Sequence, residues 1–289
     1  KGDGKAADGA AVEAMRQRFS GIDFQGRVVI GEGQKDEAPE LYTGELLGGT
    51  TGPEIDIAVD PLECTDSVAN GRYNAIAVIA TAERGGIFSA PDTYMQKIIV
   101  GPEAAGMIDL RSSVKDNLNR VAKVKGLDIT GITVAVLDRE RHGLLIDKIR
   151  ETGARVRLIS DGDVAAAVAT CIPNSGIDVV MGVGGSTEAV LAAAALKIYG
   201  GDMITQFSPT DEKHNNILTR HNLTADKLYT IDELVPGESV TFTATGVIDG
   251  PLLRGVDRAS NAIVTHSVVM RNLSGTIRFL ETYHRHSRE

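Results

Sequence analysis

The chain has 289 residues and a formal net charge of −9, from 39 acidic and 30 basic side chains. It contains no block rich in Lys and Arg and no Trp, and aromatic residues make up only 4%, which argues against a nucleic-acid-binding surface. No apolar run approaches the roughly 20 residues that span a bilayer, so we expect no membrane partner. Two cysteines are too few for a disulfide framework, which favours the cytoplasm.

The first 125 residues predict one helix followed by strands. Residues 6–19 have apolar side chains at helical spacing, and residues 67–70 form a short second helix. The segment 31–39 is acidic and rich in turn-forming residues. The predicted strands are residues 27–30, 55–59, 75–80, 85–88 and 94–100, and we expect the last two to share one antiparallel sheet.

Strands and helices alternate after residue 126. The predicted strands 132–137, 155–159 and 177–183 alternate with the predicted helices 143–151, 164–171 and 187–199. This order is typical of a parallel α/β layer. Residues 208–222 are polar and irregular, and three strands follow at 240–247, 262–270 and 276–283. We therefore predict an α/β (α+β) fold with two lobes, 1–125 and 126–289, and a site in the groove between them.

The segment Asp60-Pro61-Leu62-Glu63-Cys64-Thr65 carries the clearest chemical signal. Its two carboxylates lie three residues apart at the end of an apolar strand, and Thr65 can begin a helix. Carboxylates suit a hard divalent cation, and backbone N–H groups at a helix start, here around residues 64–66, suit a phosphate. A metal ion beside a phosphate is the arrangement of a metal-assisted phosphatase.

Five acids at the ends of regular elements form a candidate set of metal ligands and bases. They are Asp8, Glu32, Asp36, Asp60 and Glu188, and Glu63 accompanies Asp60. Any one of them also fits an ordinary cap or turn residue, or an acid placed by the helix dipole. Their recurrence beside glycines after apolar strands favours a Mg²⁺ or Mn²⁺ site, since both ions prefer oxygen ligands.

Several motifs resemble the class II fructose-1,6-bisphosphatase family, within the superfamily of lithium-sensitive sugar and inositol phosphatases. In chain order they are Gly2-Asp3, Ala7-Asp8-Gly9-Ala10-Ala11-Val12, Gly31-Glu32-Gly33, Asp36-Glu37-Ala38-Pro39, Asp60-Pro61-Leu62-Glu63-x-Thr65, Ala90-Pro91-Asp92-x-Tyr94-Met95, Asp161-Gly162-Asp163 and Gly184-Gly185-x-x-Glu188. The resemblance covers nearly the whole chain. The motifs that begin at Asp36 and Ala90 narrow it to class II.

The resemblance implies a layered α-β-α-β-α sugar-phosphatase fold. It also implies hydrolysis of the 1-phosphate of fructose 1,6-bisphosphate to fructose 6-phosphate, in gluconeogenesis or the Calvin cycle. We expect the chain to form a homo-oligomer, a dimer or tetramer. The implied ligands of Mg²⁺ or Mn²⁺ are Asp8, Glu32, Asp60, Glu63 and Glu188. Asp36 would activate the attacking water as a general base, and Thr65 would help to orient it.

The resemblance also implies the residues that contact the substrate. They are Glu63, Cys64, Thr65, Tyr94, Arg139, Arg141, Asp161, Asp163 and Gly185. Arginine suits bidentate phosphate binding, although Arg139 and Arg141 also fit a solvated loop. Asp161 and Asp163 also fit a turn and a helix cap. Tyr94 also fits strand packing. His142 could contact the second phosphate, whereas the remaining histidines are interpreted as surface or packing residues.

Two positions depart from the family pattern. The family usually has Gly where this chain has Cys64, and several relatives have Lys where it has Gly4. If residue 64 requires a positive φ, Cys costs on the order of 1 kcal/mol and weakens phosphate binding. Two alternatives stay open: a dual fructose-1,6-/sedoheptulose-1,7-bisphosphatase, and a sugar-phosphate-binding relative without catalysis.

Overall fold

The computed structural model describes residues 2–33, 41–259 and 261–285. The chain folds into two compact units. The first unit contains Lys1–Ser89 and Gly237–Glu289, and the second contains Ala90–Pro236. In the described part of the chain, no helix combines the length and the apolar character needed to cross a membrane.

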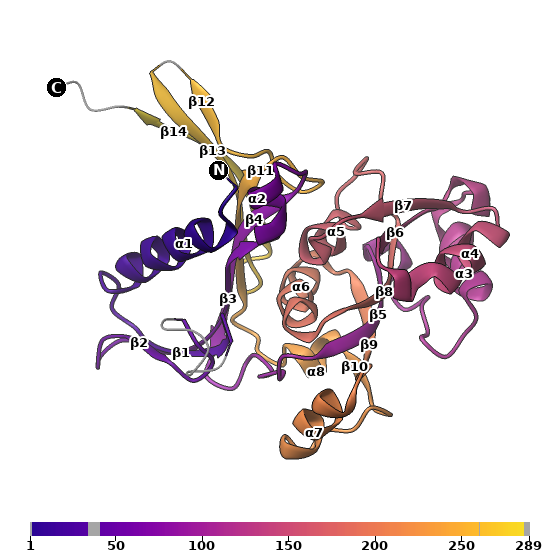
Figure 1. Cartoon of the computed structure of the whole chain (residues 1–289), viewed down its shortest axis with the longest axis horizontal. Helices are drawn as coiled ribbons and strands as arrows, with labels where there is room; N and C mark the ends of the chain where they lie inside the picture. The colour runs from indigo at the N-terminus through magenta and orange to yellow at the C-terminus, as the bar shows by residue number, and fades with distance from the viewer. Residues whose placement is uncertain (1, 34–40, 260, 286–289) are drawn as a thin grey trace. The chain divides into compact units, whose positions relative to one another are not determined.

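The first unit is built on one mixed sheet of eight strands among the described residues. Its strands are β1 (Gln25–Ile30), β2 (Leu46–Gly48), β3 (Glu54–Glu63), β4 (Ala75–Glu83), β11 (Thr241–Ile248), β12 (Asp257–Ala259), β13 (Ala262–Arg271) and β14 (Thr276–Arg285). The strand order is β12-β13-β11-β4-β3-β1-β2, and β14 pairs with β13. Figure 1 shows the late strands β11 and β13 returning to the early strands β3 and β4.

Among the described residues of the first unit, two helices accompany this sheet. They are α1 (Gly4–Phe19) and α2 (Thr65–Asn70). The Asp3 side chain caps α1 by accepting a hydrogen bond from the Ala6 N–H, which explains why the helix begins two residues before the predicted start. Val12 and Phe19 of α1 pack with Ile57 and Val59 of β3 in one apolar cluster.

The second unit contains a six-stranded mixed sheet among its described residues, in the order β10-β9-β5-β8-β6-β7. Its strands are β5 (Tyr94–Val100), β6 (Thr133–Leu137), β7 (Arg155–Ile159), β8 (Val179–Gly185), β9 (Asp202–Phe207) and β10 (Leu228–Thr230). Strands β6, β7 and β8 are parallel, as predicted, whereas β5 runs antiparallel to β8 and β9.

The helices of the second unit alternate with these strands. They are α3 (Val114–Lys125), α4 (Gly143–Glu151), α5 (Asp163–Ala169), α6 (Ser186–Tyr199), α7 (Glu212–Arg220) and α8 (Ile231–Leu234), with short 3₁₀ turns at Pro102–Ala104, Ile129–Gly131 and Glu140–His142. Every residue of α5 is buried. Most of α6 is also buried, and its buried residues are mainly small and apolar. The predicted mixed α/β fold class is confirmed by these two sheets and their helices.

The predicted division into lobes 1–125 and 126–289 is wrong in its boundaries. Residues 237–289 belong to the first unit because β11 pairs with β4 along Thr241–Ile248, and residues 90–125 belong to the second. Strand β5 therefore lies in the second sheet and not in the sheet of the early strands. Pairings between segments this distant leave no mark on local periodicity.

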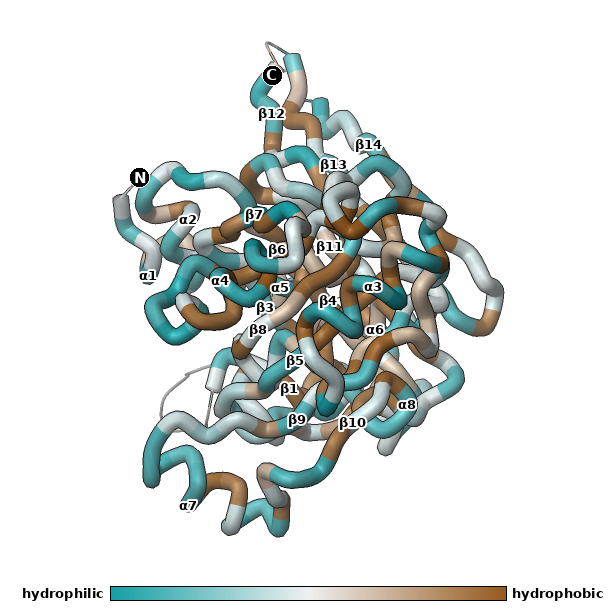
Figure 2. The backbone as a smooth tube through the Cα atoms, turned by 90° about the vertical axis from the view of Figure 1, so that its right-hand side faces the viewer, coloured by the Kyte–Doolittle hydropathy of each residue, from teal (hydrophilic) through white to brown (hydrophobic). Residues whose placement is uncertain are grey.

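Two smaller predictions also fail. Residues 85–88 form a turn instead of a strand, since Gly85 has φ +82° and the Gly86 N–H bonds to the Glu83 carbonyl. The segment 208–222 contains helix α7, which Asp211 caps through the His214 N–H. Figure 2 shows α7 as mainly hydrophilic with a short apolar stretch, consistent with the burial of Leu218 alone.

Candidate active site

In the first unit, one predicted metal ligand, Asp8, acts electrostatically on another, Glu32. Asp8 lies in the second turn of α1, and Glu32 follows β1, where its N–H bonds to the Leu41 carbonyl. Burial, and then the negative charge of Asp8, raise the pKa of Glu32 to about 7. Burial also raises the pKa of Asp8. A nearby cation would stabilise the ionised forms of both partly desolvated carboxylates.

Asp60 and Glu63 lie at an irregularity near the end of β3. The register between β3 and β4 shifts between these two residues, which is typical of a β-bulge that redirects side chains. The Asp60 carboxylate accepts a hydrogen bond from the Leu62 N–H at 3.0 Å, and Glu63 is buried. The Thr65 hydroxyl donates to the Leu62 carbonyl at 3.0 Å. The predicted signature segment is therefore a compact, internally bonded turn.

Cys64 adopts a left-handed backbone conformation in this turn. Its φ is +72° and its ψ is +46°, and it precedes the first residue of α2. Its side chain is buried next to Leu62 and Ala75. From the sequence we expect Cys64 to be strained if residue 64 has a positive φ, and in the structure its φ is positive. Glycine adopts this left-handed conformation without steric cost.

Gly4, the other departure from the family pattern, contacts the same turn. A Cβ atom on Gly4 would lie 3.1 Å from the Thr65 methyl carbon, which is tighter than ordinary van der Waals contact. A larger side chain at residue 4 would therefore require the start of α1 or the Thr65 side chain to shift.

The oxygen-rich acids fit a hard divalent cation by their chemistry. All of the predicted ligands are carboxylates, which suit Mg²⁺ and Mn²⁺. The negative charge of Asp8, which raises the pKa of Glu32, favours a cation beside these two residues. Among the residues that the structure describes, no three or more His, Cys, Asp or Glu side chains are arranged to hold a metal ion. The ligand set thus stays a prediction. Asp36, the predicted general base, lies outside the described residues.

The predicted substrate contacts of the second unit gather at one edge of its sheet. Arg139 and Arg141 follow β6, and Asp161 and Asp163 follow β7. Gly185 ends β8 and pairs with Tyr94, the first residue of the antiparallel β5. Carboxyl ends of parallel strands form the usual ligand-binding edge of an α/β sheet. The topology therefore brings these six residues to one edge, although they are far apart in the sequence.

The two arginines are anchored at this edge by backbone carbonyls. Arg139 Nη1 donates to the Ser160 carbonyl at 2.7 Å, and its Nη2 lies 3.9 Å from Asp161 Oδ1. Arg141 Nη2 donates to the Val183 carbonyl at 2.9 Å. The Arg141 guanidinium also lies 5.1 Å from the centre of the Tyr94 ring, within the range of a cation–π contact. Both cationic groups are thus oriented before any ligand arrives.

A buried charged cluster lies beside these residues, and sequence reasoning missed its central member, Lys97. The Lys97 ammonium donates to Asp163 Oδ2 at 2.7 Å and to the Gly185 carbonyl at 2.9 Å. Burial, and then the charge of Asp163, raise the pKa of Glu188, while Lys97 opposes this rise. The available signal was a lysine inside the apolar strand β5, where an unpaired charge would be costly.

His142 has a structural role that differs from the predicted contact with the second phosphate. Its ring is buried, and its Nε2 accepts a hydrogen bond from the Val183 N–H at 2.8 Å. The Nδ1 atom therefore carries the proton and donates to the Leu137 carbonyl at 2.7 Å. Burial lowers the pKa of His142, which keeps the ring neutral. Both ring nitrogens are committed to the backbone.

His214, expected at the surface, instead packs edge-to-face on Tyr94 with 5.4 Å between ring centres. His266 matches the packing interpretation, since it is buried and contacts the Gly255 carbonyl and Glu281. His214 therefore belongs to the environment of a predicted substrate contact.

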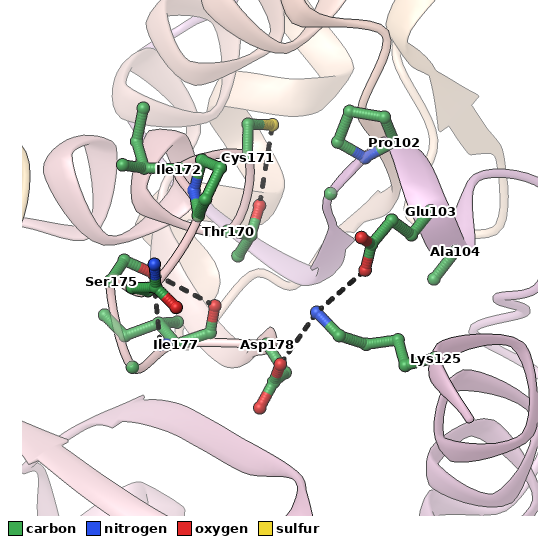
Figure 3. Close-up of a pocket in the computed structure, with 14 residues that line it drawn as sticks. Pro102, Glu103, Ala104, Lys125, Thr170, Cys171, Ile172, Ser175, Ile177 and Asp178 are labelled. Carbon is green, nitrogen blue, oxygen red and sulfur yellow. Dashed lines mark hydrogen bonds and ion pairs between the residues drawn. The ribbon is translucent and has the colours of Figure 1, made fainter. Parts of the chain in front are cut away.

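A cavity of about 550 Å³ lies at the opposite end of the same sheet. It is lined by Gly101, which follows β5, and by Asp178, which precedes β8. In the wall of this cavity, Lys125 Nζ lies 2.8 Å from Asp178 Oδ1 and 3.4 Å from Glu103 Oε2. Figure 3 shows both ion pairs as dashed lines. None of the predicted site residues lines this cavity. It is therefore separate from the edge of the second sheet that carries the predicted substrate contacts.

Comparison with known proteins agrees with the resemblance inferred from the motifs. Residues 1–284 match a family model described as bacterial fructose-1,6-bisphosphatase, glpX-encoded. Among similar curated proteins, one from Prochlorococcus marinus (strain MIT 9303) is 44% identical over an alignment of 292 positions, which covers 96% of this chain and 87% of that protein. One from Synechococcus sp. (strain RCC307) is 43% identical over the same shares.

Both relatives bear the name D-fructose 1,6-bisphosphatase class 2/sedoheptulose 1,7-bisphosphatase. The predicted resemblance is confirmed, and this chain belongs to the bacterial fructose-1,6-bisphosphatase family described as glpX-encoded.

Proposed function

We propose that this chain hydrolyses the 1-phosphate of fructose 1,6-bisphosphate to give fructose 6-phosphate and phosphate. The observation that carries the proposal is the family match over residues 1–284, supported by the names of the relatives. The gathering of arginines, aspartates and Tyr94 at one edge of the second sheet supports a sugar-phosphate ligand, since these groups complement phosphates and hydroxyls.

Asp8, Glu32, Asp60, Glu63 and Glu188 are the proposed ligands of Mg²⁺ or Mn²⁺. When bound, such ions supply positive charge that offsets the negative phosphoryl oxygens and activates water. The carboxylates themselves must be ionised to bind a metal. The raised pKa values of Glu32 and Glu188 therefore make metal binding favour higher pH.

Asp36 is the proposed acceptor of the proton from the attacking water. The Thr65 hydroxyl is the proposed group that orients this water. Its contact with the Leu62 carbonyl fixes the position of its oxygen in the turn. Glu63, Cys64 and Thr65 are proposed to lie against the phosphate that is cleaved. Since α2 has only six residues, individual N–H groups of this turn matter more than a helix dipole.

Arg139 and Arg141 are proposed to bind the phosphate that is kept. Their anchoring to the Ser160 and Val183 carbonyls reduces the entropy lost when they bind a phosphate. Asp161 and Asp163 are proposed to accept hydrogen bonds from sugar hydroxyls, with Tyr94 beside them. At Gly185, an added Cβ would overlap the Glu188 carboxylate, so a larger residue there would displace that proposed metal ligand.

A second candidate activity is hydrolysis of sedoheptulose 1,7-bisphosphate. The specific observation in its favour is that the names of both relatives include it. Both substrates carry a phosphate at each end of a sugar chain, so the same proposed phosphate-binding residues would contact either one. Parallel measurement of kcat/KM for the two bisphosphates ranks them.

We also propose a homo-oligomer that works in the cytoplasm. Strand β14 is the outer neighbour of β13, and its Phe279, Leu280 and Tyr283 side chains are 54%, 44% and 61% exposed. An exposed apolar edge strand favours pairing with a second copy of the same chain. A chain of this length with only two cysteines fits a reducing compartment.

The deciding experiment measures phosphate release from fructose 1,6-bisphosphate with Mn²⁺ and, separately, with Mg²⁺. We expect turnover that Asp36→Ala reduces by roughly 10²–10⁴ in kcat, the usual contribution of a general base. Substrate binding without turnover in the unaltered protein would instead favour the non-catalytic sugar-phosphate-binding relative. Near-normal turnover in Asp36→Ala would remove Asp36 from its proposed role.

A further inference from the structure

Lys97 occupies a place where lysine is uncommon. It lies in β5, between its register partners Gly182 of β8 and Thr205 of β9, and its side chain is only 3% exposed. Lysines are almost never fully buried unless their charge is paired. Here the ammonium is committed to two oxygens, Asp163 Oδ2 and the Gly185 carbonyl.

These two oxygens come from different elements of the second unit. Asp163 is the first residue of α5, and Gly185 is the last residue of β8. The backbone at Gly184 lies so close to Asp163 and Lys97 that no side chain larger than glycine fits there without a shift. A Cβ on Gly184 would overlap Asp163 Oδ2 and would lie 3.1 Å from Lys97 Nζ. One ammonium therefore ties β5, β8 and α5 together at the ligand-binding edge.

Stability alone does not account for such a pair. Removing two charges from water costs nearly as much free energy as their attraction returns, so a buried ion pair adds little net stability. A carboxylate, however, has several acceptor positions. Asp163 can therefore keep its bond to Lys97 while it accepts a further bond from a ligand hydroxyl.

We propose that Lys97 is a positioning residue of the substrate site, which holds the Asp163 carboxylate and the Gly185 carbonyl in the geometry that binds the sugar. This inference rests on the proposed function, in which Asp163 and Gly185 contact the substrate. In this role Lys97 acts through Asp163 and Gly185, not by contact with the reacting phosphate or the attacking water. Its loss should therefore weaken sugar binding more than it slows the chemical step.

The test compares Lys97→Met with Lys125→Met. Lys125 is a matched control, because it forms a similar lysine–aspartate pair with Asp178 at the opposite end of β8. We expect Lys97→Met to raise KM for fructose 1,6-bisphosphate roughly tenfold, the effect of losing one well-placed charge-assisted contact. We expect kcat to change by less than about threefold. Lys125→Met should leave KM unchanged.

A second readout avoids both metal and turnover. Calorimetric titration with fructose 6-phosphate in the presence of a chelator should show the same roughly tenfold loss of affinity in Lys97→Met. A merely structural role would lower the melting temperature and leave this affinity unchanged in the folded protein.

Lys97→Gln serves if Lys97→Met does not fold, since an amide can still donate to one of the two oxygens. If both variants fold, we expect the affinity of Lys97→Gln for fructose 6-phosphate to lie between those of the unaltered protein and Lys97→Met. If only Lys97→Gln folds, its affinity should be lower than that of the unaltered protein. Equal affinity in the unaltered protein and in a folded Lys97 variant would overturn the inference alone. Failure of the unaltered protein to bind fructose 6-phosphate would overturn the proposed function, and the inference with it.

Discussion

Replacing Cys64 tests the left-handed turn on which the proposed phosphate contact depends. At φ +72° and ψ +46°, a residue with a Cβ is strained by about 1–2 kcal/mol relative to glycine. Glycine loses about 0.5–1 kcal/mol more than alanine through its greater freedom in the unfolded chain. The difference favours Cys64→Gly over Cys64→Ala by about 1 kcal/mol, the reverse of the usual order.

Cys171 provides the matched control. It is also buried, and it is not among the residues of positive φ in the described structure. There the usual order should hold, with Cys171→Ala more stable than Cys171→Gly by about 0.5–1 kcal/mol. Comparing each Gly variant with the Ala variant at the same position cancels most of the loss of the buried sulfur.

Thermal and urea denaturation of the four variants measure these differences. A difference of 1 kcal/mol corresponds to about 2–4 °C in melting temperature for a chain of this size class. If Cys64→Ala proves more stable than Cys64→Gly, residue 64 does not have a positive φ in solution, and the strain argument fails. If the strain also weakens phosphate binding, Cys64→Gly should lower KM for fructose 1,6-bisphosphate. An unchanged KM would show that the strain does not affect substrate binding.

The remaining predictions concern the proposed metal ligands and the edge strand. The folded pKa of Glu32, about 7, lies above its ordinary value of 4.5, so its stabilising contribution is complete below pH 4.5 and is lost as pH rises through 7. Melting temperatures of chelator-treated protein should therefore fall more over this range than those of Glu32→Gln, and parallel curves would contradict the assignment. Glu188→Gln should raise the Mn²⁺ concentration needed for half-maximal activity, because it replaces an anionic ligand with a neutral one, and an unchanged requirement would exclude Glu188 as a ligand. Leu280→Lys on β14 should reduce the molecular mass measured by light scattering, because it places a charge on the proposed interface strand. Leu273→Lys, at an exposed position between β13 and β14, should leave the mass unchanged. Equal masses for the two variants would exclude β14 from the interface.

Much of the local structure was encoded within short stretches of sequence. Apolar periodicity located most helices and strands, and acids next to glycines marked the ends of several of them. The match of motifs such as Asp60-Pro61-Leu62-Glu63 to a family also identified the candidate residues from the sequence. These features depend on neighbours a few residues away, so a single sequence carries them.

Other features were decided only by contacts between distant segments. The boundary between the two units depends on β11 pairing with β4, more than 150 positions earlier in the chain. The burial of Lys97 became acceptable only because Asp163, 66 residues away, supplies its counter-charge. His142 became a structural residue when folding placed its ring against the Val183 N–H. Strand pairing and charge pairing at such separations follow from the free energy of the whole fold, and local pattern does not specify them.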